Sequence, residues 1–391
     1  MEKIRLKKNE DKRIIEGHLW VFSNEIDSSI EAKGEGEVVE VEDCQGNFLA
    51  KGYYNRHSLI AVRILSYQKD EKIDKDFFFK RMEQALKYRQ RLYPQLSSYR
   101  VVYSEGDFLP GLIIDKYEKS LALQILTSGM ERLEEDIIQA GEILFSPARI
   151  VLRNDASFRE LEGLVQGVRI IKGDIKNPAL IEEFGLKLFV DLKEGQKTGF
   201  FFDQKENRLI GAIYAKGRKV LDCFCYTGAW GITAAKNGAK GVLGIDSSQK
   251  SLELAQKNAK LNEVDKLCTF VKGDAFEVLR GLVQKEEKFD MVILDPPAFV
   301  KSKSKLVEGM KGYKEINLQA LKLLDKGGML ISCSCSHNLS RDLFIEIIKS
   351  SAKDAHKTLR LIEFRTQAKD HPILLSMPET EYLKCAILEV V

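Results

Sequence analysis

The sequence predicts an α/β protein whose C-terminal half folds as a doubly wound, Rossmann-like sheet. Four apolar, strand-like runs each end in an aspartate, at Asp222, Asp246, Asp274 and Asp295, and helical stretches follow the first two. In such a sheet ligands bind at the carboxyl ends of the strands, so we expect the four carboxylates to line one crevice. The competing interpretation is a set of four helix N-caps, a position that aspartate favours.

Residues 220–237 combine a buried strand, a tight turn and the start of a helix. Gly228 supplies the permissive residue of the turn, and small residues open the helix. Free N–H groups and the positive end of that helix can hold an anionic group of a cofactor. The turn lacks the Gly-x-Gly-x-x-Gly spacing of a dinucleotide site, which favours a cofactor with an amino-acid tail. Asp246, roughly 20 residues further on, is placed to accept hydrogen bonds from ribose hydroxyls.

The composition is that of a globular protein with two or three domains. Of the 391 residues, 44% are hydrophobic and 30% are charged. No apolar run approaches the roughly 18 residues of a membrane span, and the charged N-terminus lacks an apolar signal core. Seven cysteines without any pair of Cys-x-x-Cys motifs argue against a zinc site or a disulfide framework. We therefore expect a cytoplasmic protein with reduced thiols, no metal and no membrane contact.

The chain divides into three predicted domains. Residues 1–70 alternate apolar and polar positions in short runs, as in a small β-rich domain. Residues 71–182 begin with a linker helix at 76–91 and continue as a small α+β domain. Residues 183–391 hold the doubly wound sheet. Within it, a helix at 313–324 is expected to stop at Lys326-Gly327-Gly328, before a strand at 329–335.

Several motifs resemble those of class I S-adenosylmethionine (SAM) methyltransferases. Residues 197–204 are similar to a segment that closes over SAM in one branch of that superfamily. Together with Asp295-Pro296-Pro297-Ala298-Phe299 and Cys335-Ser336, they resemble the RlmI-type 23S rRNA (cytosine-5) methyltransferases over essentially the whole chain. Residues 17–22 resemble the opening of a PUA domain, an RNA-binding module, in the same family.

The resemblance implies SAM as the cofactor and a defined set of residues around it. These cofactor-binding residues are Thr198, Phe201, Gln204, Asp222, Phe224, Thr227, Gly228, Asp246, Ser247, Asp274, Ala275 and Asp295.

The resemblance also implies covalent catalysis by a cysteine. Cytosine C5 becomes nucleophilic only when a thiolate adds at C6, and Cys335 aligns with the family's nucleophile. Cys333 is the competing candidate, one pleat deeper in the same predicted strand. Asp295 is expected near N3 of the base, where it hydrogen-bonds or protonates the ring. No second cysteine follows the prolines, so the base that removes the C5 proton is not identified.

RNA is the implied partner, most plausibly 23S rRNA. Pro296 and Pro297 are expected to rigidify the substrate loop, and Phe299 to pack against an extruded base. Further substrate contacts are assigned to four basic side chains near that loop and in the N-terminal domain, namely Lys301, Lys303, Lys12 and Arg13. The oligomeric state is open, with a homodimer as one option.

Two other functions fit the same motifs. Asp-Pro-Pro-x-Phe also resembles the loop with which exocyclic-amine methyltransferases hold adenine or guanine, and those enzymes need no cysteine. The second alternative is a SAM-binding RNA module without catalysis. Loss or retention of methyl transfer in a Cys335→Ala variant separates the cytosine-C5 reaction from the amine reaction.

Overall fold

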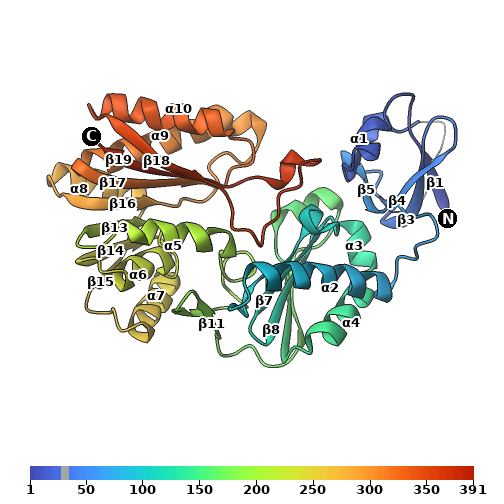
Figure 1. Ribbon diagram of the computed structural model, residues 1–391, viewed down its shortest axis with the longest axis horizontal. Helices are drawn as coiled ribbons and strands as arrows, with labels where there is room; N and C mark the ends of the chain where they lie inside the picture. Colours follow the sequence, from blue (N-terminus) through green and yellow to red (C-terminus); the bar gives the residue numbers. More distant parts are fainter. Residues whose placement is uncertain (28–34) are drawn as a thin grey trace. The chain divides into compact units, whose positions relative to one another are not determined.

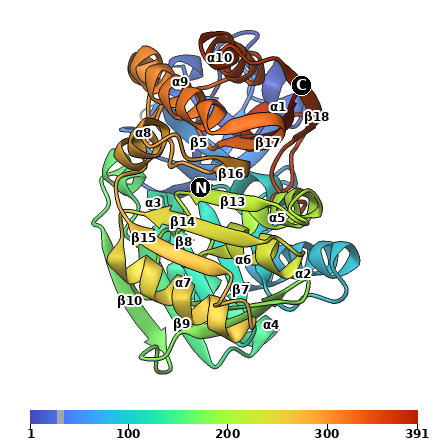
Figure 2. The same cartoon turned by 90° about the vertical axis from the view of Figure 1, so that its left-hand side faces the viewer.

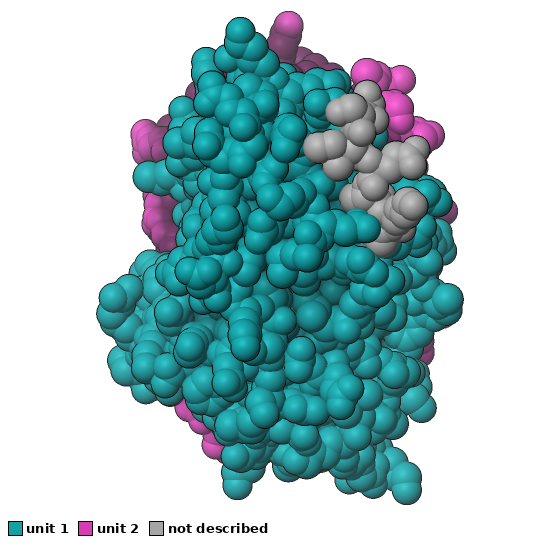
Figure 3. All heavy atoms as spheres, turned by 90° about the vertical axis from the view of Figure 1, so that its right-hand side faces the viewer, with its two compact units in different colours: residues 1–181, 190–202, 369–380 teal, residues 182–189, 203–368, 381–391 magenta. Residues whose placement is uncertain are grey.

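The computed structural model describes residues 1–27 and 35–391, which form two compact units. Unit 1 comprises residues 1–181, 190–202 and 369–380, and unit 2 comprises residues 182–189, 203–368 and 381–391 (Figure 1; Figure 3 colours unit 1 teal and unit 2 magenta). Two segments that we expected in the C-terminal domain, 190–202 and 369–380, thus belong to unit 1. The division into three domains stays a prediction.

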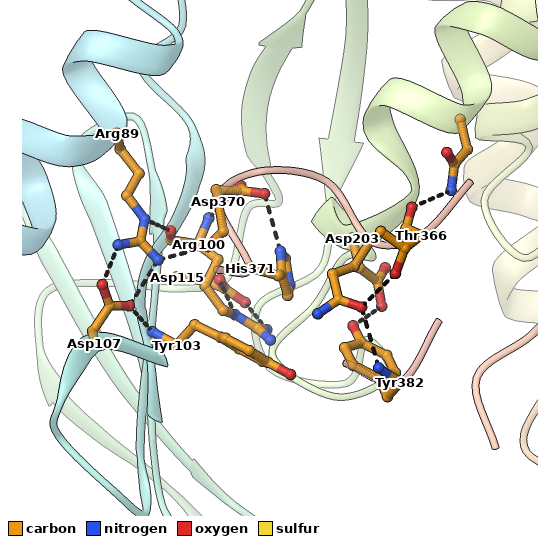
Figure 4. Close-up of polar contacts among 12 residues, drawn as sticks. Arg89, Arg100, Tyr103, Asp107, Asp115, Asp203, Thr366, Asp370, His371 and Tyr382 are labelled. Carbon is orange, nitrogen blue, oxygen red and sulfur yellow. Dashed lines mark hydrogen bonds and ion pairs between the residues drawn. The ribbon is translucent and has the colours of Figure 1, made fainter. Parts of the chain in front are cut away.

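Buried arginines attach these two segments to unit 1. Arg153 donates to the carbonyl oxygens of Leu192 at 3.1 Å and Gly195 at 2.6 Å. Arg89 forms an ion pair with Asp107 and donates to the carbonyl oxygen of Asp370 at 2.6 Å (Figure 4). Because a buried guanidinium must find acceptors for its donors, these long-range contacts fix the segments firmly.

The N-terminal part of unit 1 is the predicted β-rich domain. Its five-stranded sheet has the order β1-β3-β4-β5-β2, and its core contains Ile4, Val39 and Val62. Asp43 forms the turn between β3 and β4 by accepting hydrogen bonds from the N–H groups of Gln45 and Asn47. The elements are β1 (Glu2–Arg5), α1 (Lys12–Ile15), β2 (Trp20–Phe22), β3 (Glu37–Glu42), β4 (Phe48–Tyr54) and β5 (Ile60–Ser66).

Residues 71–181 of unit 1, where an α+β domain was predicted, contain a sheet of order β10-β9-β8-β7-β6. Helix α2, which Asp74 caps through the N–H groups of Asp76 and Phe77, packs against α4 and β6. The edge strand β10 was not predicted. The elements are α2 (Lys75–Leu92), β6 (Tyr99–Tyr103), β7 (Leu112–Tyr117), β8 (Ser120–Ile125), α3 (Ser128–Arg132), α4 (Glu134–Phe145), β9 (Arg149–Asn154) and β10 (Gly167–Lys172).

Unit 2 contains a seven-stranded sheet of order β15-β14-β13-β16-β17-β19-β18, in which β19 runs antiparallel to both neighbours. The order reverses between β13 and β16, so the switch point lies at their carboxyl ends. Its elements are α5 (Lys205–Ile213), β13 (Lys219–Cys223), α6 (Ala229–Lys236), β14 (Gly241–Asp246), α7 (Gln249–Leu261), β15 (Cys268–Lys272), α8 (Ala275–Gln284), β16 (Phe289–Leu294), α9 (Leu306–Lys322), β17 (Leu324–Ser334), α10 (Arg341–Asp354), β18 (Leu359–Arg365) and β19 (Lys384–Val390). A small sheet of β11 (Ala179–Glu183) and β12 (Leu186–Val190) precedes it in the sequence.

Helices cover both faces of this sheet, which confirms the predicted doubly wound fold (Figures 1 and 2). Helices α5, α6 and α7 lie on one face, and α8, α9 and α10 lie on the other. Leu221 and Val292 from the strands pack with Ile316 of α9 and Phe344 of α10 in one buried cluster. No helix in residues 1–27 and 35–391 is both long enough and apolar enough to cross a membrane.

One predicted boundary is wrong. Helix α9 starts at Leu306 and ends at Lys322, and Lys326-Gly327-Gly328 lies within β17 instead of stopping the helix. Strand β17 already pairs with β16 at Leu324, and the register shifts before Met329. Sheet pairing therefore outweighs the local glycine signal, and Gly327, at φ +82°, accommodates the irregularity.

The loop after β13 has an unusual backbone. Phe224 and Tyr226 adopt left-handed conformations with φ of +63° and +48°, although neither is glycine. Gly228 follows at φ +81°, and a Cβ atom there would lie 3.0 Å from both Ile232 and Phe270. Such strain is typical of functional sites, where the surrounding structure holds a loop in one shape.

We predict that Gly228→Ala lowers the free energy of unfolding by about 2–4 kcal/mol, because it adds overpacking to the cost of a left-handed alanine. Gly217→Ala is the matched control, since Gly217 has φ +73° but no atom within 4 Å of the added Cβ. It should lose only about 1–2 kcal/mol. Urea unfolding of both variants measures the difference, and equal losses would contradict the packing argument.

Candidate active site

Asp222 and Asp295 lie at the switch point of the unit 2 sheet. Strands β13 and β16 are parallel neighbours in which Asp222 pairs with Ile293, and Asp295 directly follows β16. The ends of adjacent parallel strands meet at one edge of the sheet, which confirms that the fold brings these two carboxyl groups together.

Asp222 is a fully buried carboxyl group with an unsatisfied oxygen. Its Oδ2 accepts a hydrogen bond from the N–H of Gly231 at 2.8 Å, whereas Oδ1 has no partner among the described residues. The pKa of Asp222 is raised to about 8, mainly by burial and to a smaller extent by the charges of Asp295 and Asp246, while the hydrogen bond from Gly231 acts in the opposite direction. A cationic group would stabilise the ionised form.

The loop that follows Asp222 offers further groups to a cofactor. The hydroxyl of Thr227 is buried without a hydrogen-bond partner in the described part of the chain. Asp246 accepts hydrogen bonds from the N–H groups of Tyr226 and Ser248, both at 2.9 Å, and thereby ties the loop to the end of β14. The unsatisfied atoms of Asp222 and Thr227 fit the ammonium and other polar groups of an amino-acid tail.

Other predicted cofactor residues of unit 2 have contacts of their own. Asp274 is the N-cap of α8, accepting from the N–H groups of Phe276 and Glu277, as the capping interpretation expects. Ala275 is buried as the first residue of that helix, and Ser247 is exposed. The ring of Phe224 lies 6.2 Å from that of Phe299. Their roles toward SAM stay predictions.

Two neutral donors hold the carboxyl group of Asp295. Gln204 Nε2 donates to Oδ1 at 2.8 Å, and Trp230 Nε1 donates to Oδ2 at 2.9 Å. Asn207 in turn donates to Gln204 Oε1 at 2.7 Å, which orients its amide. Burial raises the pKa of Asp295, and these two hydrogen bonds only partly oppose that effect. Trp230 was not predicted as a site residue, although it directly follows the predicted turn.

The cysteines of β17 and its end differ in their surroundings. Cys335 is partly exposed, and its Sγ lies 3.9 Å from the carbonyl oxygen of Pro296, in the loop after Asp295. Cys333 is completely buried beside Cys385, and burial raises the pKa of its thiol far above the usual range. An attacking thiol must be accessible and ionisable, so the geometry favours Cys335.

The substrate loop is partly packed into the protein. Pro296 is buried and Pro297 is exposed. The ring of Phe299 lies 4.8 Å from Tyr313 and 5.6 Å from Phe276, so this side chain belongs to an aromatic cluster. The packing of Phe299 against a base stays a prediction.

Basic residues predicted to contact RNA fall into two groups. Lys301, Lys303 and Lys12 are exposed. Arg13 forms an ion pair with the buried Glu25, and its guanidinium lies 4.8 Å from the centre of the Phe22 ring. These contacts give Arg13 a structural role that its sequence neighbourhood did not indicate.

The two predicted cofactor residues of unit 1 also have local partners. The hydroxyl of Thr198 donates to Asp115, which is paired with Arg100 at 2.7 Å (Figure 4). Phe201 is half-buried, with the Lys197 ammonium 4.7 Å from its ring centre. These interactions explain both residues without a cofactor, and their binding role stays a prediction.

Unit 1 also contains a cavity that the sequence analysis did not anticipate. It has a volume of about 440 Å³ and is lined by residues of β5, of the segment after β6 and of residues 158–162. Polar groups of Arg63 and Glu105 face it, and the exposed side chains of Phe158 and Leu161 stand beside them. No local sequence signal predicts it, because distant segments form it.

Comparison with known proteins agrees with this arrangement. The sequence matches a PUA-like domain over residues 4–67 and the S-adenosylmethionine-dependent methyltransferase family over residues 89–372. A protein of Tolumonas auensis named ribosomal RNA large subunit methyltransferase I is 41% identical over 394 residues, 99% of each chain. The chain belongs to this family. A Serratia proteamaculans protein of the same name is 40% identical over 385 residues, 97% of each chain.

Solved methyltransferases share the fold of this family member. A protein from Streptococcus mutans described as a SAM-dependent methyltransferase has a TM-score of 0.85 and 21% identity, with both chains fully covered. Another methyltransferase, complexed with S-adenosylhomocysteine, has a TM-score of 0.87 and 20% identity, also over both whole chains. The methyltransferase fold, the PUA-like domain and SAM as the cofactor are therefore confirmed.

We predict that SAM binding depends on the ionisation of Asp222. Its carboxyl group is protonated below about pH 8 in the free protein, and the cationic cofactor favours the carboxylate. Binding should therefore release a proton, and Kd should fall by up to about tenfold per pH unit up to pH 8. Isothermal titration calorimetry from pH 6 to 8.5, in buffers of different ionisation enthalpy, measures both effects.

Asp222→Asn should abolish the pH dependence and weaken binding at pH 8. Asp274→Asn is the control: its exposed cap carboxylate should change affinity by a constant factor at all pH values. A Kd for wild-type protein that does not change with pH would refute the role of Asp222.

Proposed function

We propose that this chain methylates C5 of a cytosine in 23S rRNA through a covalent adduct with Cys335. The observation that carries the proposal is the position of the Cys335 thiol, 3.9 Å from the Pro296 carbonyl and partly exposed, while Cys333 is buried. The family's name supplies the RNA, and the cysteine beside the Asp-Pro-Pro loop favours carbon over an exocyclic amine as the target.

The reaction follows from the chemistry of the base. The Cys335 thiolate bonds to C6, and the electron pair of the C5–C6 double bond moves into the ring, where Asp295 protonates or hydrogen-bonds N3. When bound, SAM supplies an electrophilic methyl group. C5 takes that methyl as the methyl–sulfonium bond breaks, which leaves S-adenosylhomocysteine as the product of the donor. A base then removes the C5 proton, and the C5–C6 double bond re-forms as the bond between the Cys335 sulfur and C6 breaks.

Asp295 suits the acid role because of its environment. A carboxyl group with a raised pKa keeps its proton closer to neutral pH than an exposed aspartate does. Gln204 and Trp230 fix its position, so that it need not reorganise as charge develops on the base.

RNA recognition is assigned to both units. The PUA-like domain, with exposed Lys12, and the lysines Lys301 and Lys303 after the substrate loop offer phosphate contacts. The exposed Phe158 beside the unit 1 cavity provides a face on which an unpaired base can stack. We propose a cytoplasmic location, which the ribosomal RNA named as the relatives' substrate supports. The homodimer stays a prediction.

We predict that Cys335→Ala lowers methyl transfer by about 10⁴-fold or more, as loss of a covalent nucleophile does. SAM affinity should not change. Cys333→Ala is the matched control, since it removes a buried sulfur from β17 only two residues before Cys335, and it should retain about a tenth or more of the activity. Mass spectrometry of nucleosides from treated 23S rRNA measures 5-methylcytidine.

Three other outcomes distinguish the alternatives. Full activity of Cys335→Ala with a methylated adenine or guanine would establish the exocyclic-amine reaction. Loss of activity in Cys333→Ala, with activity retained in Cys335→Ala, would indicate that Cys333 is the nucleophile. Absence of any methylated nucleoside with the wild-type protein would indicate a binding module.

A further inference from the structure

Lys384 is a buried lysine next to the proposed nucleophile that the reaction scheme above does not use. It begins β19 and pairs with Ser334 at the end of β17. Its side chain is 7% exposed, and Nζ donates a hydrogen bond to the carbonyl oxygen of Ser336 at 2.7 Å. The ammonium group is thereby anchored at the residue that follows Cys335.

No carboxylate in the described part of the chain lies within ion-pair distance of Lys384. Burial lowers the pKa of Lys384 to about 8, and the main opposing influences are Cys335 and Glu381. Glu381 is exposed, so solvent weakens its attraction. A buried ammonium without a carboxylate partner is costly, and such a group is often retained for function.

We propose that the Lys384 ammonium stabilises the thiolate of Cys335 and thereby activates the nucleophile. This role rests on the proposed function of Cys335 and makes Lys384 a positioning residue. The Cys335 thiol gives its proton to solvent, and the remaining negative charge is balanced by the ammonium. The sulfur electron pair then forms the bond to C6, and the same pair returns to sulfur when that bond breaks.

The other titratable groups around this pair do not offer the same stabilisation. Asp295, across the Pro296 loop, would oppose a thiolate when ionised. Tyr313 of α9 is hydrogen-bonded to Ser334 and Ser336, and burial raises its pKa to about 12, so it stays neutral. His337 is exposed and stacks on Tyr382, with the ring centres 5.2 Å apart, so solvent weakens its influence on the sulfur. Cys333 and Cys385 are buried thiols.

A competing role for Lys384 is purely structural. Its hydrogen bond to Ser336 alone would hold the end of β17 against β19 without affecting the cysteine. Both roles predict lower activity for a Lys384 variant, so activity does not distinguish them. The pH at which Cys335 becomes reactive does, because only an electrostatic role changes it.

The test is the rate of Cys335 alkylation by iodoacetamide between pH 5 and 10 in the full-length protein, followed by mass spectrometry of the peptides. Lys384→Met should move the Cys335 profile upward by about one pH unit or more and slow alkylation at pH 7.5 by about tenfold. Lys384→Arg, which keeps the charge, should restore most of the reactivity. The exposed Cys44 in unit 1 is the internal control, and its rate should not change.

An unchanged Cys335 profile in Lys384→Met would overturn the proposal. If that variant unfolds, the buried Cys333 and Cys385 will be alkylated rapidly. In that case the pH profiles of Cys335 alkylation in Lys384→Gln and Lys384→Arg are compared, and equal profiles would overturn the proposal. The assay contains neither RNA nor SAM. An unchanged alkylation profile would therefore refute the role of Lys384 without affecting the methyl-transfer result for Cys335→Ala. Likewise, an active Cys335→Ala variant would refute the proposed function without changing the alkylation result.

Discussion

The site in unit 2 depends on the burial of two carboxyl groups, those of Asp222 and Asp295. Asp222 and Asp295 lie at the ends of adjacent parallel strands, and burial raises the pKa of both. A doubly wound sheet creates this situation because its switch point leaves the strand ends open between the helices of its two faces. Neutral hydrogen-bond donors partly offset the free-energy cost of this burial. The Gly231 N–H donates to Asp222, and the side chains of Gln204 and Trp230 donate to Asp295. Both groups therefore remain responsive to a ligand's charge.

Each raised pKa has a different use in the proposed reaction. Asp222 retains an unsatisfied oxygen that a cationic cofactor can neutralise, whereas Asp295 keeps a proton available to the base. At Cys335, whose sulfur lies 3.9 Å from the Pro296 carbonyl oxygen, the proposed effect is the opposite, because the buried Lys384 ammonium favours the anionic form of the thiol. The surroundings thus favour the neutral form of the proposed acid, Asp295, and the charged form of the proposed nucleophile, Cys335.

Local sequence pattern was sufficient for the fold and for the residues at strand ends. The apolar runs ending in Asp222, Asp246 and Asp295 place those acids correctly, because a strand's carboxyl end is a local property. The boundary that failed depends on a distant partner, since the pairing of Leu324 with Phe289 turned the predicted stop of helix α9 into strand. The contacts of Arg13 with Glu25 and of Thr198 with Asp115 also join distant residues, so local pattern does not predict them. The binding roles of Arg13 and Thr198 stay predictions. Lys384 carries no motif, since its significance arises only when β19 pairs with β17.

The covalent adduct is the central claim, and trapping it tests that claim most directly. In a 23S rRNA fragment in which 5-fluorocytidine replaces cytidine, the fluorine at C5 cannot leave as a proton, so the reaction should stop after methyl transfer. With SAM present, intact-mass analysis should show one protein, one RNA and one methyl group joined, and peptide mapping should place the bond at Cys335. An adduct at another residue, or no adduct from a protein that forms 5-methylcytidine on the unmodified fragment, would contradict the mechanism.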